Sequence, residues 1–296
     1  MSLAYSVSMT QVGDKGLRDA LRFYAEELRF SAPLEREEVV EAFSAVRRER
    51  FLGPPPWRIA SPDGSYREAP GSDPVSAYHN VVFAIDPARG LNNGQPSFLA
   101  RLIDESGAAA GHHVVHVGCG TGYYSAILAE LVGENGHVTA IELDEDLAER
   151  ARRNLVDWPN VDVKQADGIL FDPGAANTVL VNAGSTYPAA VWLDRLLPEA
   201  CLILPLTVSA RVHGVGWVLK VTQGKQGLAA RFICPVGIYP CVGARDEPFD
   251  RRLREAYALG DDALSNVRSL RRDDHSEGAE CWLHTDEFCL SFLSLD

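Results

Sequence analysis

The chain has 296 residues, of which 46% are hydrophobic and 23% are charged, and its formal net charge is −13. This length suits one or two domains with a substantial core, and the composition is ordinary for a soluble globular protein. The negative charge argues against a nucleic-acid partner, because binding to a phosphate backbone depends on lysine and arginine side chains that neutralise it.

No apolar stretch reaches the ~20 residues that span a bilayer, and the N-terminal residues lack a signal-peptide pattern. We therefore expect no membrane partner and a cytoplasmic location. The six cysteines include no Cys-x-x-Cys pair, so neither a metal site nor a disulfide framework is predicted. Cys281, His284 and Cys289 have side chains that can bind metals, but we interpret them as packing residues on a pair of strands.

Apolar residues at helical spacing predict helices over 14–29 and 36–50. Residues 51–74 are rich in Pro, Gly and Ser, which predicts an extended, irregular crossing. A short strand is expected at 81–85, then a loop, then a helix over 97–105 with Pro96 near its start, a position that proline tolerates. Residues 1–75 are therefore predicted to form a helical N-terminal region that ends in this crossing.

From His113 onward, strand-like and helix-like segments alternate. The expected strands are 113–117, 137–142, 161–165, 177–183, 201–208 and 216–222. This alternation predicts an α/β fold, a doubly wound, mostly parallel Rossmann-like sheet with helices on both faces. We assign this core to residues 76–245. Residues 246–296 form a predicted C-terminal extension, with a helix near 254–260 and a hairpin or edge strand within 279–292.

The sequence VVHVGCGTG at 114–122 is the most informative motif. A β-branched run followed by closely spaced glycines predicts a strand, a tight turn and a helix, and glycines let a ligand approach the backbone closely. Glu142 ends the next expected strand, where acids bind ribose hydroxyls in nucleotide-binding α/β folds. A dinucleotide fingerprint requires G-x-G-x-x-G, but Tyr123 occupies the position of the third glycine.

The observed G-x-G-x-G pattern, with its acid two dozen residues later, resembles motif I of class I S-adenosylmethionine (SAM) methyltransferases. We therefore favour SAM as the cofactor over a nicotinamide or a flavin; ordinary turn glycines are the third alternative. The expected contacts are the methionine part and ribose for the glycine loop, the ribose hydroxyls for Glu142, and the adenine for Leu143 and the Asp167-Gly168 pair. Asn182 is expected to contact the cofactor, to line the acceptor pocket or simply to form a turn. The expected cofactor-binding residues are Gly118, Cys119, Gly120, Thr121, Gly122, Glu142, Leu143, Asp167, Gly168 and Asn182.

Over residues 36–245 the chain resembles the protein-L-isoaspartate O-methyltransferases specifically. The segments that carry the likeness are EEVVEAFSAVRRERFL, AYHNVVFAIDPARGLNNGQPSFLARLID, the motif I stretch, NTVLVNAGSTYPAAVWLDRLLPEACLILPL and ARFICPVGIYPCVG, in the family's order and spacing. The resemblance implies a SAM-dependent O-methyltransferase whose acceptor is a protein or peptide carboxylate.

Two residues depart from the family pattern. Alignment of Gln95 and Pro96 places Asn92, Asn93 and Gly94 in the loop that covers the methyl group, and Gly94 stands where the family has a serine. His116 replaces an acid that is common in the motif I strand, and we interpret it as a hydrogen-bonded structural residue. These departures keep two alternatives open: a related methyltransferase with a different, small-molecule acceptor, and an inactive cofactor-binding regulatory protein. The sequence specifies neither the catalytic residues nor an oligomeric state.

Overall fold

The computed structural model describes residues 13–61, 65–210 and 213–295. It consists of two compact units, Met1–Arg101 and Leu102–Asp296. The first residues of the N-terminus, which the signal-peptide prediction concerns, and residues 62–64 of the predicted crossing lie outside the described residues. No helix in the described part of the chain is long and apolar enough to cross a membrane. The domain boundaries at 75/76 and 245/246 stay predictions.

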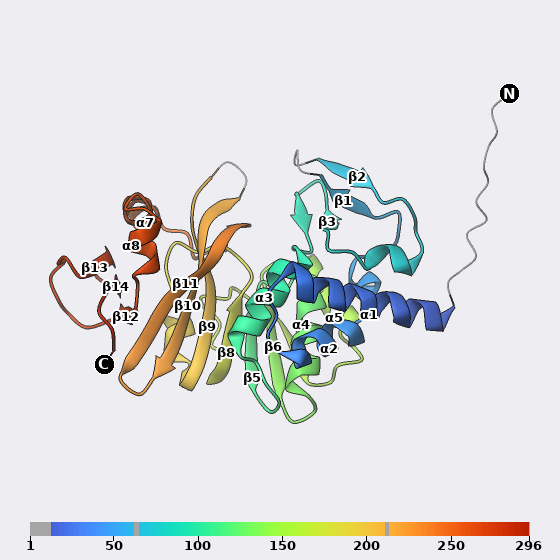
Figure 1. Ribbon diagram of the computed structural model, residues 1–296, viewed down its shortest axis with the longest axis horizontal. Helices are drawn as coiled ribbons and strands as arrows, with labels where there is room; N and C mark the ends of the chain where they lie inside the picture. The colour runs from blue at the N-terminus through green and yellow to red at the C-terminus, as the bar shows by residue number, and fades with distance from the viewer. Residues whose placement is uncertain (1–12, 62–64, 211–212, 296) are drawn as a thin grey trace. The chain divides into compact units, whose positions relative to one another are not determined.

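Helices and short hairpins make up the N-terminal unit. Its elements are α1 (Asp14–Ser31), α2 (Glu37–Ala45), η1 (Arg48–Phe51), β1 (Arg58–Ala60), β2 (Tyr66–Glu68), η2 (Pro74–Ala77), β3 (Ala84–Asp86), β4 (Leu91–Asn92) and the start of α3 (Pro96–Ser106). Helices α1 and α2 pack together (Figure 1), and the rings of Tyr24 and Phe43 meet edge to face between them. The predicted N-terminal helices are therefore present.

Two local predictions in this unit need correction. The helix predicted over 36–50 ends at Ala45, and a separate 3₁₀ turn, η1, follows. This break allows the fully buried Arg48 guanidinium to donate hydrogen bonds to three backbone carbonyl groups, those of residues 77, 79 and 81. The crossing over 51–74 is less irregular than predicted, because β1 and β2 form an antiparallel hairpin within it.

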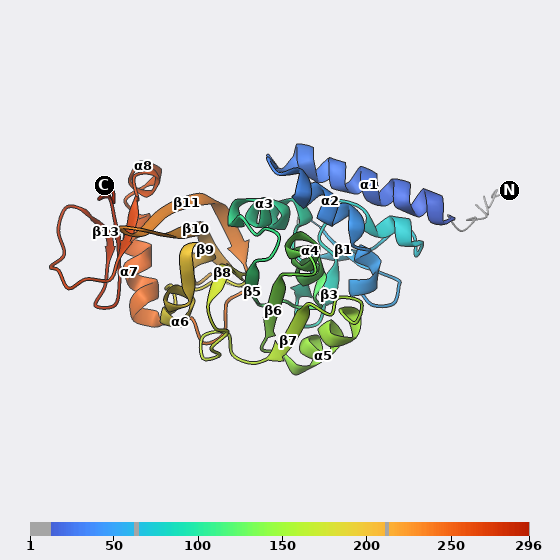
Figure 2. The same ribbon diagram turned by 90° about the horizontal axis from the view of Figure 1, so that it is seen from below.

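A ten-stranded sheet, counted over the described residues, forms the second unit (Figure 2). Its strand order is β13-β14-β12-β11-β10-β9-β8-β5-β6-β7. The strands are β5 (His113–Val117), β6 (His137–Glu142), β7 (Val161–Gln165), β8 (Ala176–Val181), β9 (Leu196–Val208), β10 (Gly214–Gly224), β11 (Gly227–Ile238), β12 (Ser269–Arg271), β13 (Cys281–His284) and β14 (Cys289–Ser291). The strands from β7 to β9 pair in parallel, and the strands beyond β9 pair antiparallel. The predicted hairpin near the C-terminus is thus present as β13 and β14, and it continues the main sheet.

Helices cover both faces of the parallel strands, as the α/β prediction requires. Helices α4 (Tyr123–Val132) and α5 (Glu145–Asn154) contact β5–β7, whereas α6 (Ala190–Asp194) and α7 (Glu247–Tyr257) contact β9, and α8 (Asp261–Ser265) contacts β11. Side chains alternate along a strand. On β5, Val115 and Val117 therefore join the core that contains Trp192 of α6, while His116 bonds to Ser125 of α4.

The carboxyl ends of β5, β6, β7 and β8 lie at one edge of this unit. Parallel strands that leave a sheet at one edge place their following loops side by side, which is where α/β folds bind ligands. The end of β6, the connections β5–α4 and β6–α5, and the segments after β7 and β8 contain the predicted cofactor-binding residues.

Candidate cofactor-binding site

The loop from Gly118 to Gly122 joins β5 to α4 and has three glycines with positive φ, at 76°, 58° and 94°. Residues with a side chain rarely adopt these angles, because the Cβ crowds the backbone. The glycines differ in what surrounds them. A Cβ at position 122 would lie 2.7 Å from Leu155 Cδ1, whereas a Cβ at Gly120 would have nothing within 4 Å. The loop backbone therefore borders open space at Gly120.

Glu142 ties the second strand end to this loop. Its Oε2 accepts a hydrogen bond of 2.7 Å from the Gly120 N–H, and its Oε1 accepts one of 3.1 Å from the Asp144 N–H. Burial raises the pKa of the Glu142 carboxyl, and the two N–H donors act in the opposite direction by stabilising the charged form. The carboxylate is thus positioned beside the glycine loop, as the sequence predicted.

An exposed leucine follows this buried acid. Leu143 leaves 41% of its surface accessible, and a large apolar side chain in that state is available to pack against a ligand ring. Asp144 then begins α5, because its carboxylate accepts a hydrogen bond of 3.0 Å from the Leu147 N–H and caps the helix. The carboxylate of Glu142, the apolar surface of Leu143 and the helix cap Asp144 thus follow one another at the end of β6.

Asp167 and Gly168 follow β7. Asp167 Oδ1 accepts a 3.1 Å hydrogen bond from the Ile169 N–H, which turns the chain sharply. Gly168 packs tightly, since a Cβ there would lie 2.4 Å from Val117 Cγ1, and its carbonyl accepts a hydrogen bond from the indole of Trp192. Gly168 is therefore a close-packing position in this structure.

Three more predicted residues support the glycine loop. The Asn182 N–H donates to the Val117 carbonyl over 2.8 Å, which holds the end of β8 against β5. The Thr121 carbonyl accepts a 2.9 Å hydrogen bond from the Asn154 side chain of α5. Cys119 is buried, and burial raises the pKa of its thiol. The Asn182 contact therefore holds the strand that leads into the loop, and the Asn154 contact ties the loop to α5.

His116 lies beneath the site as a structural residue, in agreement with its interpretation from sequence. It is fully buried, and its Nδ1 lies 2.8 Å from Ser125 Oγ. Burial lowers the pKa of His116 to about 4, so the imidazole is neutral at pH 7.

Sequence reasoning missed a group of residues next to Asp167. Gly243 lies so close that a Cβ there would be 2.8 Å from Asp167 Oδ2, and the Tyr187 hydroxyl donates to the Gly243 carbonyl over 3.2 Å. Cys241 is held nearby by a 2.8 Å hydrogen bond from its N–H to the Gly184 carbonyl. The sequence contained no signal for this arrangement beyond the expected strand order, because the residues that meet here are 56 to 76 positions apart.

The loop predicted to cover the methyl group lies in the N-terminal unit. The Asn93 side-chain carbonyl accepts a 2.8 Å hydrogen bond from the Phe83 N–H, and Asn92 Oδ1 accepts one of 2.9 Å from the Gly94 N–H. Gly94 has a φ of 74°. The glycine that replaces the family's serine therefore occupies a backbone conformation that serine rarely adopts.

Comparison with known protein families identifies the family of this chain. The family model described as Protein-L-isoaspartate(D-aspartate) O-methyltransferase (PCMT) matches residues 24–226, more than half of the chain. The chain belongs to this family. A PCMT relative from Ignicoccus hospitalis, named protein-L-isoaspartate O-methyltransferase, is 29% identical over 213 residues, which cover 71% of this chain and 90% of the relative. A relative of the same name from Rhodopseudomonas palustris is 30% identical over 190 residues, covering 61% and 77%.

Solved structures agree with the PCMT fold. A protein-L-isoaspartate O-methyltransferase superposes with a TM-score of 0.58 at 18% identity, covering 82% of this chain and 70% of its own. A second structure is a putative PCMT from Plasmodium falciparum in complex with S-adenosyl-L-homocysteine. Its TM-score is also 0.58, at 15% identity, and the match covers 75% of this chain and 97% of its own. The predicted methyltransferase fold is confirmed.

This member of the PCMT family is therefore a SAM-dependent methyltransferase, as the sequence predicted. The residues present fit the cofactor: open space borders Gly120, the exposed Leu143 offers an apolar surface, and the Glu142 carboxylate is held beside the loop. Each of these features suits a nucleoside, which needs close backbone approach, an apolar contact for its base and an acceptor for its ribose.

Proposed function

We propose that the chain transfers the methyl group of SAM to a peptide or protein carboxylate, and that an isoaspartyl side chain is its acceptor. Family membership supports this acceptor, because the matched relatives are named for it. Bound SAM supplies an activated methyl group. The acceptor oxygen forms a bond to the methyl carbon as the carbon–sulfur bond breaks. The electron pair of the broken bond remains on sulfur.

The observation that carries the carboxylate assignment is the state of the groups around the site. A hydroxyl acceptor needs a general base, whereas a carboxylate with a reference pKa near ~4 is already ionised at pH 7. The His116 imidazole is buried beneath the loop and bonded to Ser125. Burial raises the pKa of the Cys241 thiol to about 11 and raises that of the Tyr187 phenol. None of these three groups suits a base at neutral pH, so the proposal uses an acceptor that requires none.

Within this proposal the predicted residues hold and orient the cofactor. Gly118–Gly122 lie along the methionine part and the ribose, Glu142 accepts hydrogen bonds from the ribose hydroxyls, and Leu143 packs beside the adenine. Asp167 binds the edge of the adenine, and Gly168 keeps the chain close to β5. Catalysis then depends mainly on positioning, since a fixed attack geometry lowers the barrier of a reaction between activated partners.

Two further roles complete the assignment. Asn182 holds the end of β8 against β5 and lines the acceptor side. Residues Asn92–Gly94 keep the role that the family resemblance implies for them, in the loop near the methyl group. Because Gly94 has no hydroxyl, the acceptor carboxylate must find its hydrogen-bond donors elsewhere.

Transfer of labelled methyl from SAM tests the acceptor. The three substrates are an isoaspartyl peptide, the same peptide with ordinary aspartate, and a small dicarboxylate such as succinate. The proposal predicts a base-labile methyl ester on the isoaspartyl peptide and little label on the aspartyl control. Transfer to succinate alone would instead identify a small-molecule acceptor. Absence of transfer to all three, by protein that binds S-adenosylhomocysteine, would contradict the proposal and favour a regulatory role.

A further inference from the structure

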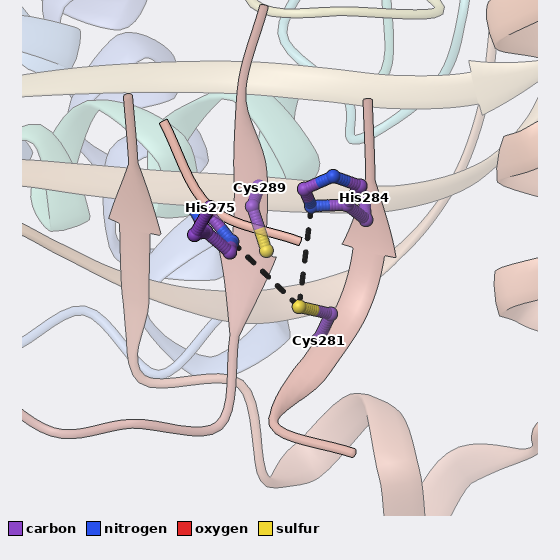
Figure 3. A group of neighbouring side chains, drawn as sticks. All are labelled: His275, Cys281, His284 and Cys289. Carbon is purple, nitrogen blue, oxygen red and sulfur yellow. Dashed lines mark hydrogen bonds between the residues drawn. The ribbon is translucent and has the colours of Figure 1, made fainter. Parts of the chain in front are cut away.

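A cluster of two histidines and two cysteines lies at the far end of the sheet from the parallel strands. We propose that His275, Cys281, His284 and Cys289 bind a structural zinc ion. Their ligand atoms all lie within 4.8 Å of one another, and Figure 3 shows the four side chains converging from two strands and a loop. This site is independent of the methyl-transfer site and of its proposed acceptor.

The distances within the cluster suit tetrahedral coordination. His275 Nε2 lies 3.7 Å from Cys281 Sγ, and His284 Nδ1 lies 4.0 Å from the same sulfur. In a tetrahedral zinc site with Zn–S of ~2.3 Å and Zn–N of ~2.0–2.1 Å, neighbouring ligand atoms are about 3.3–3.8 Å apart. A small contraction of the side chains would therefore close the site around an ion.

The strand pairing explains how the ligands share one face. His284 and Cys289 are direct partners across β13 and β14, so their side chains project from the same side of the sheet. Cys281 is three residues before His284 and would ordinarily point to the other side. The register shift between Cys281 and Leu283 corrects this, since a bulge re-aims the side chain beside it.

The fourth ligand comes from the loop between β12 and β13. The Nδ1 of His275 lies 2.9 Å from the Asp273 carbonyl oxygen, which leaves Nε2 directed toward Cys281. Metal-binding histidines commonly use their second nitrogen in this way, because the outer hydrogen bond fixes the orientation of the ring. Asp273 is itself held by Arg271, whose Nη2 lies 2.6 Å from Asp273 Oδ2.

The surroundings of Cys281 also suit a thiolate. The Gly278 N–H donates to Cys281 Sγ over 3.5 Å, and a backbone donor of this kind stabilises a sulfur that carries negative charge. Cys289 is fully buried, and both cysteines are free thiols. Zinc would displace a proton from each thiol, so two thiolates and two neutral imidazoles would neutralise the ion.

The donor set selects the metal and its role. Thiolate and imidazole ligands favour zinc over magnesium or calcium, which prefer oxygen. Four protein ligands fill a tetrahedral site and leave no position for a water or substrate, which is the arrangement of structural zinc. Strands β12, β13 and β14 have three or four residues each. A zinc ion would tie these short strands to the irregular loop over 272–280.

Metal content of the full-length protein tests the proposal. The protein is expressed in zinc-supplemented medium, dialysed against metal-free buffer and measured by mass spectrometry of the elements. We expect about one zinc ion per chain in the wild type. Cys281→Ser and His275→Ala should lose most of it, whereas Cys201→Ser, which alters a buried cysteine of β9 outside the cluster, should retain it. Equal zinc in wild type and Cys281→Ser would show adventitious binding and overturn the proposal.

A second measurement uses the unaltered chain and does not depend on the folding of variants. Removal of metal with a chelator should lower the melting temperature, and zinc should restore it. Cobalt in place of zinc should give the thiolate charge-transfer absorption and the intense visible bands of a tetrahedral site. A folded wild type that takes up neither ion, or in which Cys281 and Cys289 are joined by a disulfide under reducing purification, would contradict the proposal.

Discussion

The carboxylate of Glu142 accepts a 2.7 Å hydrogen bond from the backbone N–H of Gly120, and so joins the ends of two neighbouring parallel strands. One residue ends β6 and the other lies in the loop after β5. The contact makes the acid part of the glycine loop's support as well as a candidate acceptor for ribose. A carboxylate has about four acceptor sites, so these two uses are compatible.

The glycines at 120 and 122 should respond differently to substitution by alanine. Gly122→Ala adds a clash with Leu155 to the backbone strain, which should lower the free energy of unfolding by about 2–4 kcal/mol. Gly120→Ala adds strain alone and should cost about 1–2 kcal/mol, but its methyl group projects into the space assigned to the cofactor. Urea denaturation and binding of S-adenosylhomocysteine separate the two effects. Equal stability losses with equal binding would contradict this distinction.

His116 should make stability depend on pH. Burial lowers its pKa in the folded state to about 4, below the reference of 6.5, so the unfolded chain takes up the proton first as the pH falls. The contribution is complete above pH 6.5 and is lost between pH 6.5 and about 4, by about 3 kcal/mol in all. His116→Gln should flatten this part of the pH profile measured by denaturation. An unchanged profile in the variant would assign the effect to other groups.

Replacement of Gly94 by the serine of the family should not increase methyl transfer. Gly94 has a φ of 74°, so Gly94→Ser should cost about 1–2 kcal/mol through backbone strain. We expect the variant to transfer methyl to an isoaspartyl peptide no faster than the wild type. Rates of labelled transfer, measured with a saturating cofactor, check this. A marked increase in rate would show that the missing hydroxyl, rather than the loop conformation, limits the reaction.

Leu143 should contribute apolar contact to cofactor binding and little to folding. Its side chain is 41% exposed, so Leu143→Ala should leave the melting temperature nearly unchanged. Loss of contact with the adenine should weaken binding of S-adenosylhomocysteine about fivefold to twentyfold. Leu170→Ala, at a leucine that is 79% exposed, provides the matched control and should bind normally. Similar affinity in both variants would remove Leu143 from the site.

The elements that could be predicted from the sequence are those that depend on the pattern of neighbouring residues. The Gly118–Gly122 loop and Glu142 could be found because a strand, a turn and a helix each have their own local signature. The second helix was predicted to be too long, because apolar residues continue at helical spacing past Ala45. The burial of Arg48, which follows the end of the helix, depends on carbonyl groups about thirty residues away. Local pattern carries no information on such a contact.

Long-range pairing explains the other omissions. Gly243 lies close to Asp167 because the segment after β11 pairs with Gly184. No residue spacing in the sequence predicts this pairing. The sequence did not place His275 with Cys281, His284 and Cys289 for a related reason. Its loop folds back onto β13 and β14, and the bulge that turns Cys281 toward His284 follows from strand register.

Calorimetric titration with S-adenosylhomocysteine tests the central claim most directly, namely that Glu142 and the glycine loop form the cofactor site. The wild type should bind, and Glu142→Ala should bind at least about tenfold more weakly, because it loses charged hydrogen bonds. Glu142→Gln, which keeps one carbonyl acceptor, should be intermediate, and Glu134→Ala, at an exposed acid in the turn before β6, should match the wild type. Folded wild-type protein that fails to bind, or a Glu142→Ala variant with wild-type affinity, would contradict the account.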